Sequence, residues 1–195
     1  MNYDDMLEYT RQEINNSGRV ERFPFRDRYS HTLRVIKWAE RIHKYEGGDL
    51  EVIKIACIFH DVDWDKDINH SLISKKAAEK YLLDHDYNCE KLKLFLEAIE
   101  NHNFRNDEND VGIESYIVMD ADILDEVCTL SIIWDAMATM LQENKSYYDV
   151  YNRLRFYLNR MDHPERLKTK TGKINFTERI QVVKDFIKEL EFEPL

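Results

Sequence analysis

The sequence predicts an all-α protein that folds as one domain over its 195 residues. Apolar residues recur mostly at three- and four-residue spacing, which is the period of an amphipathic helix, and no convincing period-two strand interrupts them. The chain has only five glycines and three prolines, and so few breakers argue against a turn-rich sandwich or barrel. Because no repeat, low-complexity tract or Pro/Gly/Ser linker marks a boundary, we expect a single domain spanning residues 1–195.

The same spacing predicts the helices in order along the chain. Asp49 follows the breaker pair Gly47-Gly48 and can cap the next helix through its carboxylate. That helix reads LEVIKIACIFH, is apolar almost all round, and is therefore expected at the centre of the fold. The expected helices cover about residues 2–16, 26–46, 50–60, 71–84, 89–102, 113–127, 129–143, 147–161 and 174–190, with a surface loop at 103–112.

Charge and hydropathy exclude several kinds of partner. The chain has 38 acidic residues and 28 lysines and arginines, so its formal net charge is −10. This surplus, without any run of basic residues, disfavours nucleic acid polymers and anionic lipid, which bind basic patches. The longest apolar run, Ile55 to Phe59, has five residues, whereas a membrane span needs ~18 or more. We expect no nucleic-acid and no membrane partner.

The cysteines and the start of the chain indicate a cytoplasmic protein. Cys57, Cys89 and Cys128 are widely spaced and form no CxxC pair, so we expect reduced, buried thiols. The acidic start MNYDDMLEY lacks the apolar core of a signal peptide.

His60 and Asp61 stand where the central helix ends, directly after five apolar residues. Imidazole and carboxylate side by side are good ligands for a first-row metal ion. The dipeptide alone is a weak signal, because His85-Asp86 is a second such pair that we interpret as an exposed loop.

Other residues strengthen the first pair. His31 lies on the apolar face of the helix before it, although a lone histidine there is more often a hydrogen-bonded core residue than a ligand. Asp120 and Asp122 lie in the otherwise apolar stretch YIVMDADILDEV. Carboxylates at such positions need a partner, because a buried unpaired charge is very costly. A metal ion would supply that partner for several of them at once.

The order His31, His60-Asp61 and Asp122 resembles the HD superfamily of metal-dependent phosphohydrolases, which is named for this dyad. The stretches RYSHTLRV, ACIFHDVDWDKD, HSLISKKAAEKYL, DADILD and LKTKTGKINFTERI are similar to the matching segments of small bacterial HD hydrolases, over about residues 28–185. The resemblance implies a metal site in the core of the helix bundle. Its ligands would be His31, His60, Asp61 and Asp122.

Helical periodicity and the resemblance disagree on the last ligand. Periodicity puts Asp120 on the face shared with Leu124, and Asp122 roughly opposite. The family pattern places the ligand at the second aspartate of such a D-x-D-x-x-D stretch. We therefore expect Asp122, with Asp120 as the alternative; otherwise Asp120 is a buried side chain bonded to backbone or to an arginine.

Two imidazoles and two carboxylates leave positions open around one divalent ion, with Mn, Fe, Co, Ni, Zn and Mg all as candidates. Such an ion activates water for attack on phosphorus and polarises a phosphoryl oxygen. Many relatives carry a carboxylate three residues after the dyad, where this chain has Trp64. Either Asp65 transfers the proton in its place or the catalytic detail differs, and Lys66 is expected to offset charge on the phosphate. Arg34, one turn from His31, either faces the phosphate or forms a surface salt bridge.

His70 and His102 have two interpretations. In dinuclear HD enzymes, additional histidines between the dyad and the last aspartate hold a second metal. The pattern is incomplete here, because Asn103 follows His102 where a His-His pair would be expected. We therefore expect a single ion, with His70 and His102 contacting the substrate or supporting the ligands.

The expected function is hydrolysis of a phosphate ester or anhydride in a nucleotide or similar small phosphorylated compound. The resemblance favours a nucleotide. The aromatic residues of the C-terminal half are expected to pack helices, and they could also supply a stacking wall for a base; they include Trp134, Tyr147, Tyr148, Tyr151, Phe156 and Tyr157. The alternatives are a phosphodiesterase for a cyclic or signalling nucleotide and a non-catalytic nucleotide-binding sensor on the same fold. The same aromatic helices are also compatible with a homodimer.

Overall fold

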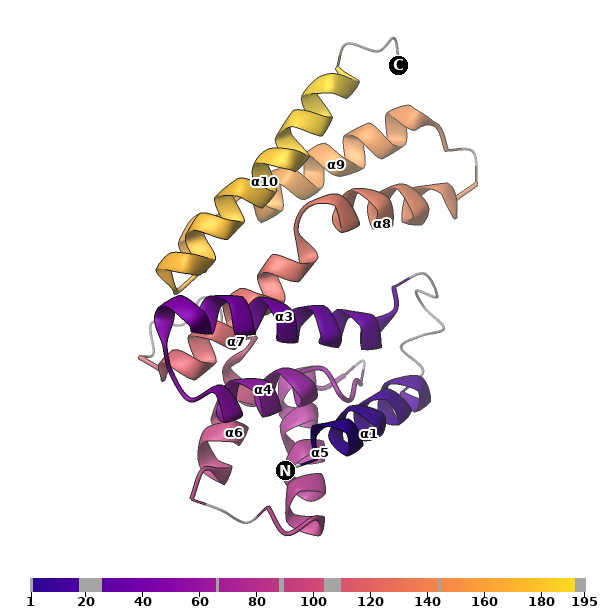
Figure 1. Ribbon diagram of the computed structural model, residues 1–195. Coiled ribbons are helices and arrows are strands. Elements are labelled where there is room, and N and C mark those ends of the chain that lie inside the picture. Colours follow the sequence, from indigo (N-terminus) through magenta and orange to yellow (C-terminus); the bar gives the residue numbers. More distant parts are fainter. Residues whose placement is uncertain are drawn as a thin grey trace.

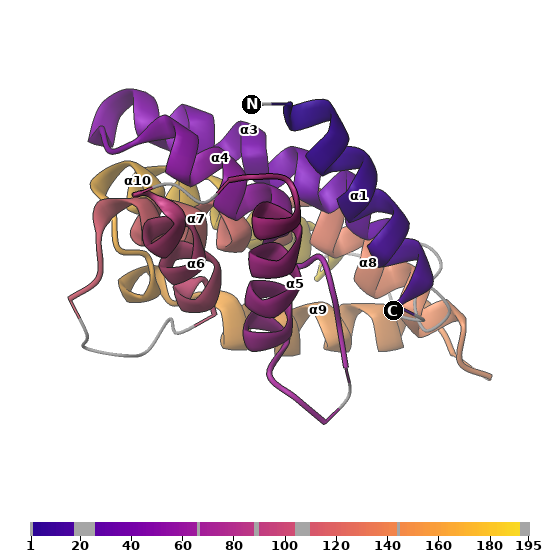
Figure 2. The same cartoon turned by 90° about the horizontal axis from the view of Figure 1, so that it is seen from below.

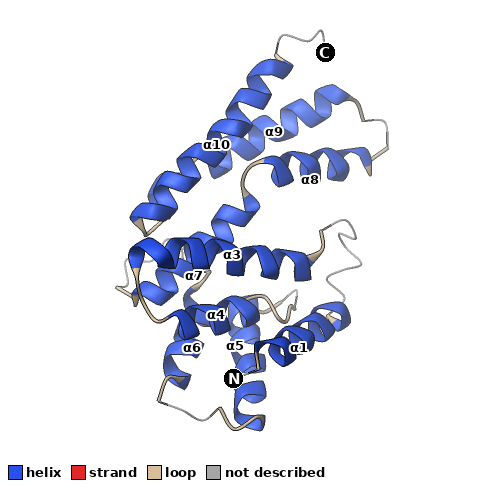
Figure 3. Cartoon of the chain, viewed as in Figure 1, coloured by secondary structure: helices blue, strands red, loops and turns tan. Residues whose placement is uncertain are grey.

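The structure is a computed structural model that describes residues 2–17, 26–65, 67–87, 90–103, 110–143 and 145–191. Within these ranges the regular structure is entirely helical, which confirms the predicted all-α class (Figures 1 and 3). The elements are α1 (Tyr3–Asn16), α3 (Arg28–Glu46), α4 (Leu50–Phe59), α5 (His70–Asp84), α6 (Leu92–Asn101), α7 (Ile113–Glu126), α8 (Thr129–Met140), α9 (Tyr147–Met161), the 3₁₀ helix η1 (Pro164–Arg166) and α10 (Lys170–Leu190).

The helices form two groups that meet along α3 and α7 (Figure 1). In the first group α4 packs against α1, α3, α6 and α7, and α5 packs against α6. Seen from below, α5 and α6 stand in front of the layer that contains α3 and α4 (Figure 2). In the second group α8 and α9 form an antiparallel pair, and α10 packs across α9, α7 and α3. Helix α7 therefore connects the two groups.

Helix α4 lies at the centre, as its composition predicts. Its residues from Val52 to Phe59 are buried except Lys54, since neighbouring helices cover it on several sides. The Asp49 carboxylate caps its first turn by accepting the backbone N–H of Glu51 at 3.0 Å. The turn before it uses Gly47 and Gly48, with φ of +80° and +90°, a region that favours glycine.

The start of α10 differs from the prediction. The helix begins at Lys170, whereas the spacing of apolar residues placed its start at about residue 174. The Thr169 hydroxyl caps it by accepting the backbone N–H of Gly172 at 2.8 Å. Glycine disfavours a helix interior, yet a Cβ at this position would lie 2.2 Å from Oδ2 of Asp120. Close packing of α10 on α7 therefore requires glycine at residue 172, in the first turn of α10.

The last turn of α7 is held by side chains from the second group. The guanidinium of Arg179 on α10 donates to the backbone carbonyls of Leu124 at 3.0 Å and Val127 at 2.6 Å. The hydroxyl of Tyr157 on α9 donates to the carbonyl of Glu126 at 2.8 Å. These bonds satisfy carbonyls that a helix end leaves unpaired, and so they fix the direction in which the end of α7 points.

The cysteine prediction is confirmed where the structure describes the residues. Cys57 and Cys128 are buried and form no disulfide, and burial raises the pKa of the Cys57 thiol well above its usual range. Cys89 lies outside the described residues. Among the described helices, none combines the length and the apolar character needed to cross a membrane.

Candidate metal centre

Three buried side chains from three elements converge in the core of the first group. His31 comes from α3, His60 from the residue that ends α4, and Asp122 from the second half of α7. Nε2 of His31 lies 3.2 Å from Nε2 of His60 and 3.2 Å from Oδ1 of Asp122. One donor atom from each residue lies within 4.8 Å of the other two. We call these three residues the first donor group.

Hydrogen bonds behind the two rings define their tautomers. Nδ1 of His60 donates to the backbone carbonyl of Cys57 at 2.8 Å, since a carbonyl oxygen can only accept. Nδ1 of His31 lies 2.7 Å from Oδ2 of Asp125 and donates to it. In the neutral rings both Nε2 atoms therefore carry lone pairs, and these face each other and a carboxylate. Such a contact requires a proton or a cation between the atoms, so the donor set fits a metal ion.

The electrostatics of the site favour the neutral ring that binds metal. Burial lowers the pKa of His60 well below its ordinary value, and the neighbouring rings of His102 and His31 add to the effect. Metal ligation requires an unprotonated imidazole nitrogen. The surroundings of His60 thus keep it in the ligating form.

Asp125 supports the first donor group from behind. Burial raises the pKa of its carboxyl, but hydrogen bonds from His31 and Arg34 outweigh that effect and lower the pKa overall. Arg34 contacts both oxygens of Asp125, at 2.7 Å and 3.0 Å. A carboxylate behind a histidine fixes the orientation of the ring and raises its basicity. The sequence allowed two roles for Arg34, contact with the phosphate or a surface salt bridge. In the structure it forms a partly buried ion pair with Asp125.

Asp61 lies in a second donor group with His70 and His102. The donor atoms of these three residues also lie within 4.8 Å of one another. Nε2 of His70 lies 3.5 Å from Oδ1 of Asp61 and 3.1 Å from Nε2 of His102. Oδ2 of Asp61 also pairs with the guanidinium of Arg28. Sequence reasoning missed Arg28, although it stands at the start of the RYSHTLRV stretch, three residues before His31.

The second donor group repeats the arrangement of the first. Nδ1 of His102 donates to the backbone carbonyl of Ile99 at 2.6 Å, so its Nε2 lone pair faces His70. The ring centroids of His60 and His102 are 5.2 Å apart, which makes the two groups neighbours. The structure thus brings His70 and His102 to the dyad and divides the four ligands implied by the resemblance, three in the first group and Asp61 in the second.

Asp120 lies apart from both donor groups. Its carboxylate accepts the backbone N–H groups of Lys168 and Thr169, both at 2.8 Å, and the Thr169 hydroxyl at 2.7 Å. Burial raises its pKa to about 6. This is the backbone-bonded arrangement that the sequence allowed as the alternative for Asp120, while Asp122 faces His31.

The two residues expected to handle the phosphate are only partly described. Asp65 is exposed, and its carboxylate accepts the backbone N–H of Asp67 at 2.7 Å, within its own loop. Lys66 lies outside the described residues.

Comparisons with known proteins agree with the fold. The HD domain family matches residues 28–126, just over half of the 195-residue chain. An HD-superfamily hydrolase from Bacillus thuringiensis is 19% identical, with a TM-score of 0.71, over 96% of this chain and 94% of that chain. The Lin1889 protein from Listeria innocua is 24% identical, with a TM-score of 0.67, over 98% and 96%. Bacillus subtilis YpgQ, solved in complex with ADP, is 21% identical, with a TM-score of 0.68, over 97% and 96%.

At these identities the likeness to solved structures shows a shared fold alone. A comparison with curated protein sequences finds no match. The family match is independent of both, and it spans the dyad, His31, Asp122 and Asp125. The resemblance inferred from the sequence is therefore confirmed: the chain belongs to the HD domain family.

Proposed function

We propose that the protein is a metal-dependent phosphohydrolase that acts on a nucleotide or a similar small phosphorylated compound. The observation that carries the proposal is the convergence of two Nε2 lone pairs and the Asp122 carboxylate in the first donor group. A divalent cation bound there supplies an activated water and polarises a phosphoryl oxygen.

The proposed roles follow from the contacts. His31, His60 and Asp122 hold the ion, with Asp61 as the fourth ligand that the family pattern implies. Asp125 keeps the His31 ring in its ligating tautomer.

The second donor group borders the ion, because the His60 and His102 rings are adjacent. With one ion bound, the proposed role of His70 and His102 is to contact the substrate phosphate. With a second ion, they and Asp61 would be its ligands. The number of metal ions per chain separates these two arrangements.

A nucleotide is the substrate class we favour. A similar structure, that of Bacillus subtilis YpgQ, was solved in complex with ADP. A cyclic-nucleotide phosphodiesterase would use the same ion on a diester. A non-catalytic nucleotide-binding sensor on the same fold is the second candidate function, because Trp64 stands where many relatives carry a carboxylate.

The test combines metal analysis with an activity panel. Elemental analysis of the purified protein comes first. Phosphate release is then measured from nucleoside mono-, di- and triphosphates and cyclic nucleotides with Mn²⁺, Co²⁺, Ni²⁺ or Mg²⁺. We expect His60→Ala to lose both metal and activity. His163→Ala is the matched control, because His163 is exposed and pairs only with Glu165 among the described residues.

The outcomes separate the candidates. A His60→Ala variant that keeps full activity would contradict the proposal that the protein is a metal-dependent hydrolase. Bound metal and tight nucleotide binding without any turnover would support the sensor instead.

A further inference from the structure

A pocket of about 350 Å³ lies where the end of α7 meets α8 and α9. A smaller space of about 110 Å³ shares several of its wall residues. We call the two together the arginine pocket. The wall residues that matter here are Arg26, Trp134, Arg153, Phe156, Tyr157 and Arg160.

The arginine pocket is locally basic on an acidic protein. Its three arginines face two carboxylates, Glu126 and Asp135, which leaves one positive charge in excess, whereas the whole chain carries −10. Asp135 is already paired with Nε of Arg153 at 2.7 Å. Arg26 and Arg160 have no ion pair with any residue that the structure describes, so an anion entering the pocket meets cations that are still available.

Arg26 is the most informative of these cations. Its Nε atom is buried and has no hydrogen-bond partner within the described residues. The guanidinium carbon lies 4.5 Å from the centroid of the Trp134 ring, so the group is held against the indole. A buried donor without an acceptor is costly, and an anionic ligand would supply the acceptor.

The pocket also offers aromatic surface. Phe156 is 67% exposed at its rim, an unusual position for a large apolar side chain on a helix. Tyr157 forms part of the wall, with its hydroxyl occupied by the Glu126 carbonyl. A planar ring entering beside the arginines would find an aromatic edge to pack against.

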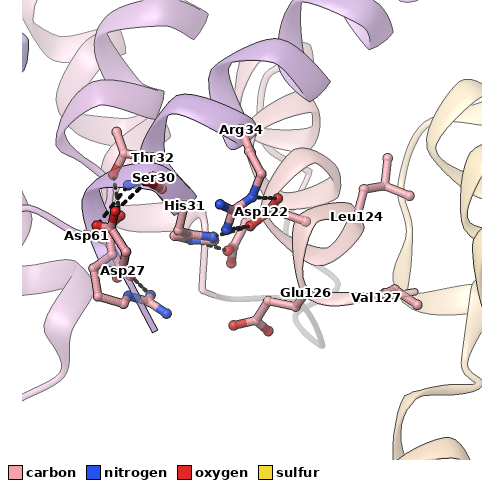
Figure 4. A network of polar contacts seen from close by, with 12 residues as sticks. Asp27, Ser30, His31, Thr32, Arg34, Asp61, Asp122, Leu124, Glu126 and Val127 are labelled. Atoms are coloured by element: carbon pink, nitrogen blue, oxygen red, sulfur yellow. Dashed lines mark hydrogen bonds and ion pairs between the residues drawn. The ribbon is translucent and has the colours of Figure 1, made fainter. Parts of the chain in front are cut away.

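One wall residue of the arginine pocket, Glu126, lies close in α7 to Asp122 of the metal centre. Glu126 lies four residues after Asp122, which puts both on one face of α7, about one turn or ~6 Å apart along the axis. Figure 4 shows the two side chains on the same side of the helix. The guanidinium of Arg34, which pairs with Asp125, also lies 5.8 Å from the Trp134 ring centroid. A ligand that spans both sites would lie along this side of α7, past Arg34 and Trp134.

We propose that the arginine pocket binds the part of a nucleoside polyphosphate that is not attacked. Arg26 and Arg160 contact the remaining phosphate, and the base packs against Phe156. This inference rests on the proposed function, since the attacked phosphate sits at the first donor group. It selects nucleoside di- and triphosphates over simple phosphate esters, which have nothing to place among the arginines.

The test measures the binding of two probes, ADP and inorganic phosphate, to the metal-loaded protein by calorimetry. Arg160→Gln and Arg26→Gln should each weaken ADP binding roughly tenfold, the usual cost of one charge-assisted contact. Phosphate binding should stay unchanged. Arg155→Gln is the matched control, because Arg155 lies on the same helix but contacts Tyr151 instead of the pocket. Because Arg26 also packs on Trp134, its variant is accepted only if its melting temperature is near that of the wild type.

ADP binding that is unchanged in both pocket variants, or equally weakened in Arg155→Gln, would overturn the inference. Its failure is distinct from failure of the proposed function. If the pocket variants release phosphate with an unaltered KM, the role of the arginine pocket is contradicted and the proposed hydrolase activity is supported. If the pocket variants lose ADP binding but the wild-type protein releases no phosphate, the role of the arginine pocket is supported and the proposed hydrolase activity is contradicted.

Discussion

At the scale of single residues, the hydrogen bonds behind the histidines determine what the site can bind. His31 and His60 both donate from Nδ1, one to a carboxylate and the other to a backbone carbonyl. Each ring is therefore oriented before any ion arrives, with the Nε2 lone pair toward the centre. When the ligands of a site are already oriented, less free energy is lost in ordering side chains as the metal ion binds.

The substitution Asp125→Asn tests this orientation. An amide at this position keeps the size of the side chain but loses the charge that both His31 and Arg34 contact. We expect metal affinity to fall about 10- to 100-fold, the usual effect of removing such a supporting carboxylate. A Co²⁺ titration followed by absorbance measures the metal affinity. Asp162→Asn is the control, because Asp162 pairs with Lys184 of α10 in the second group of helices. Equal affinities for the two variants would contradict the role given to Asp125.

The limits of sequence reasoning are clearest at Asp120 and Asp122. Periodicity identifies the buried face of a helix only when the other face is exposed. In α7 every residue from Ile117 to Asp125 is buried, so the period carries no information there. The family pattern could still point to Asp122. The partner of His31, by contrast, is 94 residues away in sequence, and no local spacing reveals such a bond.

At the scale of elements, α10 determines how α7 presents its aspartates. Asp120 on α7 accepts three hydrogen bonds from the start of α10, and Arg179 on α10 caps the other end of α7. The sequence predicted both helices from their apolar spacing. It could not predict the contact between them, because that contact depends on a glycine where propensity alone disfavours a helix.

Gly172→Ala should therefore destabilise the protein. At an ordinary helix position this substitution stabilises by up to ~1 kcal/mol, but here the new Cβ meets Oδ2 of Asp120 at 2.2 Å. We expect a net loss of about 1–3 kcal/mol in the free energy of unfolding, the usual cost of overpacking. Urea unfolding measures it. Gly112→Ala is the control, because its Cβ would meet only the flexible Glu114 carboxylate, at 3.1 Å.

A double-mutant cycle makes this prediction specific. In an Asp120→Ala background the main clash is gone, so Gly172→Ala should cost clearly less than it does in the wild type. Thr169 Oγ1, 2.8 Å from the new Cβ, remains as a smaller obstacle. An equal cost in both backgrounds would place the strain elsewhere than at Asp120.

The junction between α7 and α8 allows a second test at this scale. Cys128 has φ of +92° and ψ of −147°, a backbone conformation that suits glycine and costs other residues about 1–3 kcal/mol. Cys128→Gly and Cys128→Ala lose the same buried sulfur, so their comparison isolates the backbone. We expect the glycine variant to be more stable than the alanine variant by about 1 kcal/mol in thermal unfolding. The reverse order, which is usual elsewhere in proteins, would contradict the strain.

At the scale of the whole molecule, the net charge of −10 does not show that part of the negative charge lies in the interior. The buried residues include the carboxylates of Asp61, Asp120, Asp122 and Asp125. Asp61 pairs with Arg28, and Asp125 pairs with Arg34. Asp120 accepts hydrogen bonds from backbone N–H groups. Asp122 faces the His31 ring, whose Nε2 lone pair points toward it. A divalent cation at that point would contact both the Asp122 carboxylate and this Nε2 atom and make the local field suitable for a phosphate.

Metal removal should therefore lower the stability of the entire fold. The first donor group joins α3, α4 and α7, so an ion held there binds the folded state and not the unfolded chain. At free metal 100 times its Kd the gain is about 2.7 kcal/mol, which corresponds to a rise in Tm of roughly 5 to 10 °C for a chain of this size. Differential scanning calorimetry with Mn²⁺ and with excess chelator measures the difference. In His60→Ala the same two conditions should give equal Tm values, and an undiminished metal-dependent rise in that variant would place the ion outside the first donor group.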